Sequence, residues 1–420
     1  MHQLSLKKIK RSPLSFIYPT KSTAFCYLKE FYNYRSPFEQ YGRRYQVNIG
    51  SKRSSTVYSK SNIFDKSFKI IWNVPSFQCH KYGLNFSQVS KWGIMQNYED
   101  TFRGDKIALL YDPGLFPALL EANMDSDFIR RNGGVPQEGN ITQHLEIFAD
   151  QIQNKLMPNK NFSGLAIIDF EHWRPIWSEN FGSLTPYRKV SRKIEQNKHP
   201  LWTVSEVEEQ AMKRFEKAAQ QFFHNTLLVA KKLRPNALWG YYGFPLCFNY
   251  TPKNQKATCS DSVMENNKRI KWLFEESSAI FPSLYYKKYS MNENSRAMFM
   301  KGRMAEAMRV SRMSYTPAPV YPYTWLKYYD TKDFVGKNDI INSFVIPRKE
   351  GAAGVIIWGA SNDVNTEKKC LALDEYVRNI LGPVAHFVLN TPKEEIYTIL
   401  GNSIVEKPNT IDVDEINMNS

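Results

Sequence analysis

The sequence predicts an α/β fold, a distorted (β/α) barrel of the TIM type that forms a single large domain. Short apolar runs alternate with amphipathic stretches from Phe68 onward, which is typical of repeated strand–helix units. The runs are apolar on both faces, as in a parallel sheet. The chain has 420 residues, of which 42% are hydrophobic, and this length suits one barrel domain. A doubly wound open sheet is the alternative, although no G-x-G-x-x-G motif follows the first run.

The expected strands share a short, largely apolar sequence, and they are 70–74, 107–111, 165–169, 237–242, 283–286, 320–325 and 354–358. The expected helices are amphipathic, and they are 142–156, 203–233, 296–313 and 366–381. The clearest helix begins with a capping box of Thr203 and Glu206 and ends before Pro235. Its apolar residues recur on one face: Val207, Ala211, Phe215, Ala218, Phe222 and Leu233.

The two ends of the chain differ from this pattern. Residues 1–66 hold 13 basic and 3 acidic side chains without sustained periodicity, so we expect a disordered or non-native basic leader. Residues 67–390 form the expected barrel domain, and residues 391–420 a polar tail. The net charge of +15 lies mostly in the leader, and no nucleic-acid-binding motif is present, so a nucleic-acid partner is not expected. No segment is long and apolar enough to span a membrane.

The most informative segment is 165–171, where four apolar residues lead into Asp169 and Glu171. Residues at i and i+2 of a strand face the same way, and the carboxyl ends of barrel strands form the active-site face. Two close carboxyls cannot both ionise freely, so one can serve as a general acid near neutral pH. Solvated acids at an ordinary strand end are the alternative. Trp173, expected as a stacking face, and aromatic or hydroxyl groups at other strand ends favour a sugar site.

Cysteines and glycosylation sequons indicate the compartment. Five cysteines are present without a CxxC pair, so no zinc site is expected. Sequons stand at Asn85, Asn140, Asn161 and Asn249. Together these features predict a secreted glycoprotein, although the N-terminus lacks the apolar core of a signal peptide.

Several ordered segments resemble the hyaluronidases of glycoside hydrolase family 56, and most of all the insect venom and allergen members. They are 72–75 (WNVP), 79–83 (CHKYG), 111–114 (YDPG), 132–137 (NGGVPQ), 169–175 (DFEHWRP), 239–242 (WGYY) and 357–359 (IWG). The resemblance covers residues 68–390. It implies an endo-acting hyaluronoglucosaminidase, a monomer without cofactor or metal. Such an enzyme hydrolyses the β-1,4 bond between N-acetylglucosamine and glucuronate in hyaluronan, and chondroitin is a second candidate substrate.

The resemblance also implies roles for single residues in a retaining, substrate-assisted mechanism. Glu171 matches the proton donor, Asp169 its supporting carboxylate, and Tyr242 the residue that positions the substrate acetamido group. Substrate-binding positions are matched by Tyr111, Asp112, Arg174, Ser283, Tyr285, Arg303, Trp358 and Ser361. Ala360 stands where similar proteins carry serine. Disulfides are implied between Cys79 and Cys370 and between Cys247 and Cys259, which leaves Cys26 in the leader unpaired.

Two other functions compete with this interpretation. A chitinase-like hydrolase would share the barrel and the acetamido chemistry, but such enzymes carry a further aspartate where this chain has Ile167. A non-catalytic glycan-binding or allergen-type homologue would usually have lost its acid, whereas Glu171 is present.

Overall fold

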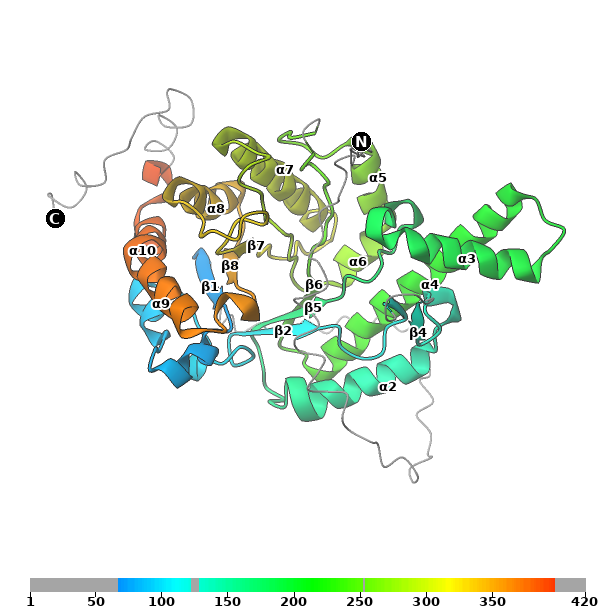
Figure 1. Cartoon of the computed structure of the whole chain (residues 1–420), viewed down its shortest axis with the longest axis horizontal. Coiled ribbons are helices and arrows are strands. Elements are labelled where there is room, and N and C mark those ends of the chain that lie inside the picture. Colours follow the sequence, from blue (N-terminus) through cyan, green and yellow to red (C-terminus); the bar gives the residue numbers. More distant parts are fainter. Residues whose placement is uncertain (1–66, 122–127, 252–253, 397–420) are drawn as a thin grey trace, which may run out of the picture.

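The computed structural model describes residues 67–121, 128–251 and 254–396. The leader, Cys26 and most of the tail therefore lie outside the described residues. Figure 1 shows the central strands surrounded by helices. The strands are β1 (Lys69–Asn73), β2 (Ile107–Tyr111), β3 (Ala118–Leu120), β4 (Ile129–Arg131), β5 (Leu165–Asp169), β6 (Leu238–Tyr241), β7 (Tyr323–Trp325) and β8 (Gly354–Trp358). The helices are α2 (Ile141–Gln151), α3 (Thr185–Lys198), α4 (Val204–Leu233), α5 (Asp261–Arg269), α6 (Lys271–Glu276), α7 (Glu293–Ser311), α8 (Lys337–Glu350), α9 (Glu367–Tyr376) and α10 (Gly382–Asn390).

The central strands are parallel and form a distorted barrel, as predicted. One sheet has the order β2-β5-β6 and the other β1-β8-β7. Between β6 and β7, single parallel bridges join Tyr242 to Phe281, Ile280 to Val320 and Ser283 to Tyr323. The expected strand at 283–286 is therefore wrong, because only isolated bridges form there. Pro282 contributes to this break, since proline has no N–H to donate to a ladder.

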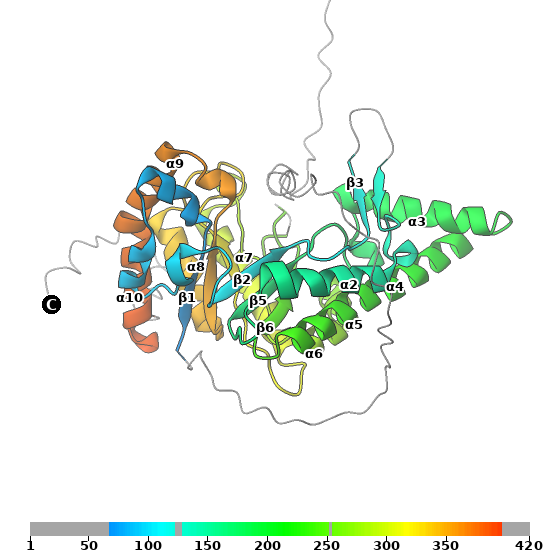
Figure 2. The ribbon, with the colours of Figure 1, turned by 90° about the horizontal axis from the view of Figure 1, so that it is seen from below.

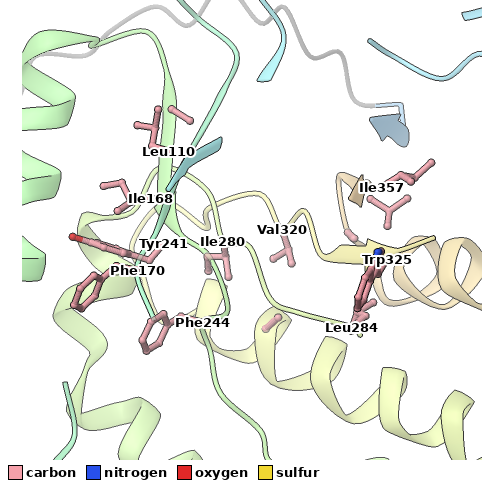
Figure 3. Packing of buried hydrophobic residues seen from close by; sticks show 14 of the residues in the cluster. Leu110, Ile168, Phe170, Tyr241, Phe244, Ile280, Leu284, Val320, Trp325 and Ile357 are labelled. Carbon is pink, nitrogen blue, oxygen red and sulfur yellow. The ribbon is translucent and has the colours of Figure 1, made fainter. Parts of the chain in front are cut away.

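Alternate side chains of β1, β2, β5 and β8 enter two different cores. One core fills the barrel and includes Leu109 of β2, Ile167 of β5 and Ile356 of β8. The other lies between the strands and the helices, where Leu110, Ile168, Val320 and Ile357 pack (Figure 3). Gly240 has no space for a side chain, because a Cβ there would lie 2.2 Å from the Ala279 carbonyl oxygen. The alternation of side chains along a strand between these two cores decides which of them reach the mouth of the barrel.

Helix α4 confirms the capping prediction. The Thr203 hydroxyl accepts from the Glu206 amide, and the Glu206 carboxylate accepts from the Thr203 amide. The buried face includes Ala219 rather than the expected Ala218, which is only partly buried. Helices α3 and α4 pack together in a hairpin that projects from the body of the protein (Figures 1 and 2). The sequence analysis missed α3, α5, α6, α8, α10 and the antiparallel β3–β4 pair.

Both expected disulfides form. Cys79, just after β1, is bonded to Cys370 of α9, and Cys247 is bonded to Cys259. The first bond joins residues 291 positions apart, so it ties the start of the barrel to its last helices. Within the described part of the chain, no helix is long and apolar enough to cross a membrane.

Candidate active site

The interior alternation of β5 places two carboxyls at the mouth of the barrel. Leu165 and Ile167 belong to the interior core, Asp169 continues their alternation at the last position of β5, and Glu171 follows two residues later. Asp169 pairs in register with Tyr111 of β2. The amide of Asp112 donates to the Asp169 carbonyl at 2.8 Å, which keeps the two chain segments together past the strand ends. The predicted carboxylate pair is therefore at the carboxyl end of the barrel.

The surroundings of these carboxyls favour a protonated acid near neutral pH. Glu171 is open to solvent on one side, but burial by the surrounding protein raises its pKa to about 7. Burial, and then the charges of Glu171 and Asp112, raise the pKa of Asp169 well above its usual range. Asp169 Oδ1 is buried without a hydrogen-bond partner among the described residues. A bound ligand can supply that missing partner.

Tyr242 follows β6 and lies beside the carboxyls. Its hydroxyl donates to Ser283 Oγ at 3.0 Å. Its ring lies 5.3 Å from Tyr323, nearly perpendicular, and 6.0 Å from Tyr285. Burial, and then the Glu171 charge, raise the pKa of Tyr242 well above its usual range. The phenol thus stays neutral and able to donate a hydrogen bond to a substrate oxygen.

A pocket of about 100 Å³ adjoins these groups. Its lining contains predicted site residues: Glu171, Tyr242, Ser283, Tyr285 and Arg303. Arg303 is fixed there, because its Nη1 donates to the Ser283 carbonyl at 2.6 Å and its Nε to Asn249 Oδ1 at 3.2 Å. The sequence analysis missed other lining residues, among them Phe248, Lys287 and Tyr329.

Four aromatic rings stand together on the carboxyl side of β7 and β8, and we call Tyr285, Trp325, Tyr329 and Trp358 the aromatic wall. Trp358 is stacked on Tyr285 at 5.5 Å and lies 5.1 Å from Trp325, which is 6.3 Å from Tyr329. Trp358 Nε1 donates to the Tyr111 hydroxyl at 2.9 Å, so two predicted residues fix each other. Ser361, which was predicted to bind substrate, lies just after β8, at the start of a 3₁₀ turn. Tyr285, Tyr329 and Trp358 are partly exposed and can face a sugar ring, whereas Trp325 is buried and packs behind them.

Asp112 is held by partners that the sequence did not reveal. Arg131 of β4 binds both of its carboxylate oxygens, at 2.5 and 2.9 Å. His172 Nε2 lies 3.3 Å from Asp112 Oδ2. Burial alone would raise the pKa of Asp112, but Arg131 and His172 hold it well below its usual range. Asp112 is therefore an ionised carboxylate near Asp169. The one sequence signal for its partners was the position of His172, directly after Glu171.

Three expectations need correction. Trp173 is not a stacking face, because it is 1% exposed and donates to the Pro117 carbonyl within a cluster of aromatic rings. Arg174 lies behind the pocket wall, with its guanidinium 5.0 Å from the ring centre of Phe248. It therefore supports the wall rather than lining the cleft.

The third correction concerns the sequon at Asn249. This side chain is fully buried, and its amide nitrogen donates to the carbonyls of Lys256 and Phe299. A glycan on that nitrogen would break both bonds, so Asn249 is a structural residue and not a glycosylation site of the folded chain. Asn85, Asn140 and Asn161 are exposed, and their glycosylation stays a prediction.

Within the described ranges, no three histidine, cysteine or acidic side chains are grouped so that they could hold a metal ion. The site thus offers carboxyl, phenol and guanidinium groups beside aromatic faces. Such a set of groups can transfer a proton to a ligand held against the aromatic faces.

Comparison with known proteins gives a consistent result. The hyaluronidase family model matches residues 58–394. A hyaluronidase of Apis mellifera is 44% identical over 338 residues, which cover 80% of this chain and 88% of that protein. Hyaluronidase A of Vespula vulgaris is 44% identical over 76% of this chain and 96% of that protein. The crystal structure of bee venom hyaluronidase in complex with a hyaluronic acid tetramer has a TM-score of 0.74 at 44% identity, and covers 77% of this chain and 99% of that one.

Proposed function

The chain belongs to the hyaluronidase family, and we propose that it is a secreted endo-acting hyaluronidase that cleaves the β-1,4 bond between N-acetylglucosamine and glucuronate in hyaluronan. The observation that carries the proposal is the Asp169–Glu171 pair at the mouth of the barrel, beside Tyr242 and the aromatic wall. The structural neighbour described with a hyaluronic acid tetramer supports the same substrate.

Glu171 is the general acid in this proposal. A pKa of about 7 keeps its proton available near neutral pH, and the pocket gives it access to a bound glycan. It donates this proton to the glycosidic oxygen as the bond to the leaving sugar breaks. Glu171 then accepts a proton from the water that completes hydrolysis, so it returns to its starting form.

The substrate supplies the nucleophile. Asp169 and Glu171 extend from one strand and approach the sugar from the same side, whereas an ordinary retaining pair lies about 5–5.5 Å apart on opposite faces of the bond. The acetamido oxygen of the N-acetylglucosamine closes on its own anomeric carbon, as in other substrate-assisted glycosidases. On substrate binding the Tyr242 hydroxyl turns its one proton from Ser283 Oγ to the acetamido oxygen, and this new hydrogen bond orients the group. The unpartnered Asp169 Oδ1 accepts from the acetamido N–H, and in its ionised form Asp169 stabilises the positive charge that develops there.

A test of the acid compares the chain with its Glu171→Gln variant on polymeric hyaluronan. Loss of one general acid lowers turnover by about 10²–10⁴-fold, while the melting temperature should stay the same because Glu171 is open to solvent. Fragment lengths from hyaluronan and from chitin oligomers separate the proposal from a chitinase-like activity. Near-normal hyaluronan cleavage by the variant would contradict the role of Glu171. Absence of cleavage by the unaltered chain would favour a glycan-binding protein instead.

A further inference from the structure

Lys332 stands on the outer edge of the aromatic wall with its charge in a fixed place. Its ammonium lies 4.1 Å from the ring centre of Trp325 and 4.6 Å from that of Tyr329. The side chain is nevertheless exposed to solvent. An ammonium over aromatic faces is attracted by the negative π surface, and this attraction limits the directions in which the charge can move.

The backbone of the loop after β7 presents this lysine in an uncommon conformation. Lys332 has φ +62°, in the left-handed region that side chains other than glycine rarely adopt. The Lys332 amide donates to the Tyr328 carbonyl at 3.1 Å, and the Tyr328 amide donates to the Asp333 carbonyl at 3.0 Å. A bridge between Lys327 and Phe334 closes the loop below. Such backbone strain in non-glycine residues is concentrated at ligand-binding sites.

The other charged groups of this loop are already engaged. Lys327 is paired with Asp363 at 3.4 Å, and Asp333 with Lys288 at 3.0 Å. Asp330 accepts from the backbone amides of residues 288 and 289. Asp363 and Asp330 act on Lys332 by their charges, but among the residues that the structure describes no carboxylate forms an ion pair with its ammonium. Lys332 therefore has capacity for an anion from outside the chain.

The position of Lys332 relative to the Glu171 carboxyl suggests which anion it binds. Tyr329, under the ammonium, lines the same pocket as Glu171. The Glu171 charge also contributes, after burial, to raising the pKa of Tyr329 to about 12, so the two groups are close enough to interact. In hyaluronan every N-acetylglucosamine has a glucuronate on each side. A sugar stacked on the wall next to the acetamido unit at Tyr242 is thus a uronate.

We propose that Lys332 is a specificity-determining residue that binds the carboxylate of the glucuronate next to the cleaved N-acetylglucosamine. The inference rests on the proposed function and adds to it a cation that selects acidic glycans. It differs from Arg303, whose guanidinium is fixed inside the pocket by Ser283 and Asn249. Lys332 is exposed and its ammonium lies over Tyr329, which lines the pocket, so a bound polymer can reach it from outside.

The test uses two variants of the full chain and two polymers. Lys332→Met keeps the aliphatic length and removes the charge, and Lys332→Arg keeps both the charge and the ring contact. The polymers are hyaluronan and carboxyl-reduced hyaluronan, in which glucose replaces glucuronate. Lys193→Met on α3 is the matched control, because Lys193 is likewise exposed but lies on the projecting hairpin.

We expect Lys332→Met to raise the KM for hyaluronan about two- to fivefold, with a smaller change in kcat, as for the loss of one exposed ion pair. Lys332→Arg and Lys193→Met should both keep the original KM. On carboxyl-reduced hyaluronan, Lys332→Met and the unaltered chain should have the same KM. The increase in KM with added salt should also be shallower for Lys332→Met.

Two results would overturn the inference while the proposed function stands. One is an unchanged KM of Lys332→Met on hyaluronan at low salt. The other is an equal rise in KM on both polymers, which would indicate that Lys332 only packs on the rings. A failure of the unaltered chain to cleave hyaluronan would instead overturn the proposed function, and this inference with it.

Discussion

The pH dependence of kcat/KM follows from the environment of Glu171. The acid must be protonated in the free enzyme, and burial raises its pKa to about 7. An unperturbed glutamate, with a pKa of about 4.3, would be only about 2% protonated at pH 6. With a pKa of about 7, about 90% of Glu171 carries the proton at pH 6 and about 10% at pH 8. The activity should therefore fall about tenfold between these values as pH rises.

A substitution near Glu171 can shift, in a known direction, the pH at which kcat/KM falls. His172 lowers the pKa of Glu171 electrostatically, so His172→Gln should shift the fall in kcat/KM to higher pH. His199→Gln, at the tip of the α3–α4 hairpin, is the matched control and should leave the pH at which kcat/KM falls unchanged. Initial rates on hyaluronan at low substrate concentration, measured from pH 4 to 9, give both profiles. The reasoning is refuted if the unaltered chain loses activity with a midpoint near pH 4.5, or if His172→Gln shifts the fall in kcat/KM to lower pH.

The other predictions concern stability and the acetamido contact. The entropy model gives about 5–6 kcal/mol for the Cys79–Cys370 bond, which closes 291 positions, and about 3 kcal/mol for Cys247–Cys259, which closes 12. Paired Cys→Ser variants in chemical denaturation should show the larger loss of unfolding free energy at the first bond, and the reverse order would contradict the model. Tyr242→Phe removes the hydroxyl bonded to Ser283 and should lower kcat by more than it raises KM, because the contact matters most in the transition state. A change confined to KM in steady-state rates would place Tyr242 in binding alone.

The sequence predicted those features that depend on local periodicity. The two-residue alternation of β5 runs from the interior core directly to Asp169 and Glu171, so the carboxylate pair could be located before the fold was known. The capping box of α4 is equally local, and the structure has both of its hydrogen bonds. The disulfide pairs were implied by resemblance alone, since five cysteines allow several pairings.

What the sequence could not predict depends on contacts between distant segments. Arg131 reaches Asp112 because the β3–β4 pair places it beside the residue that follows β2. Trp173 follows the acid in sequence but turns into the aromatic core, because no strand alternation continues past Glu171. Lys332 depends on a left-handed loop residue, a conformation for which lysine gives no sequence signal.

The central claim is that the substrate's acetamido group, and not an enzyme carboxylate, attacks the anomeric carbon. Partly de-N-acetylated hyaluronan tests it directly, since acetylated and deacetylated glucosamine then compete within one polymer. The composition of the newly formed reducing ends is the measurement. We expect these ends to be N-acetylglucosamine, while the deacetylated polymer still binds. Reducing ends of free glucosamine, formed in proportion to its content in the polymer, would contradict the claim.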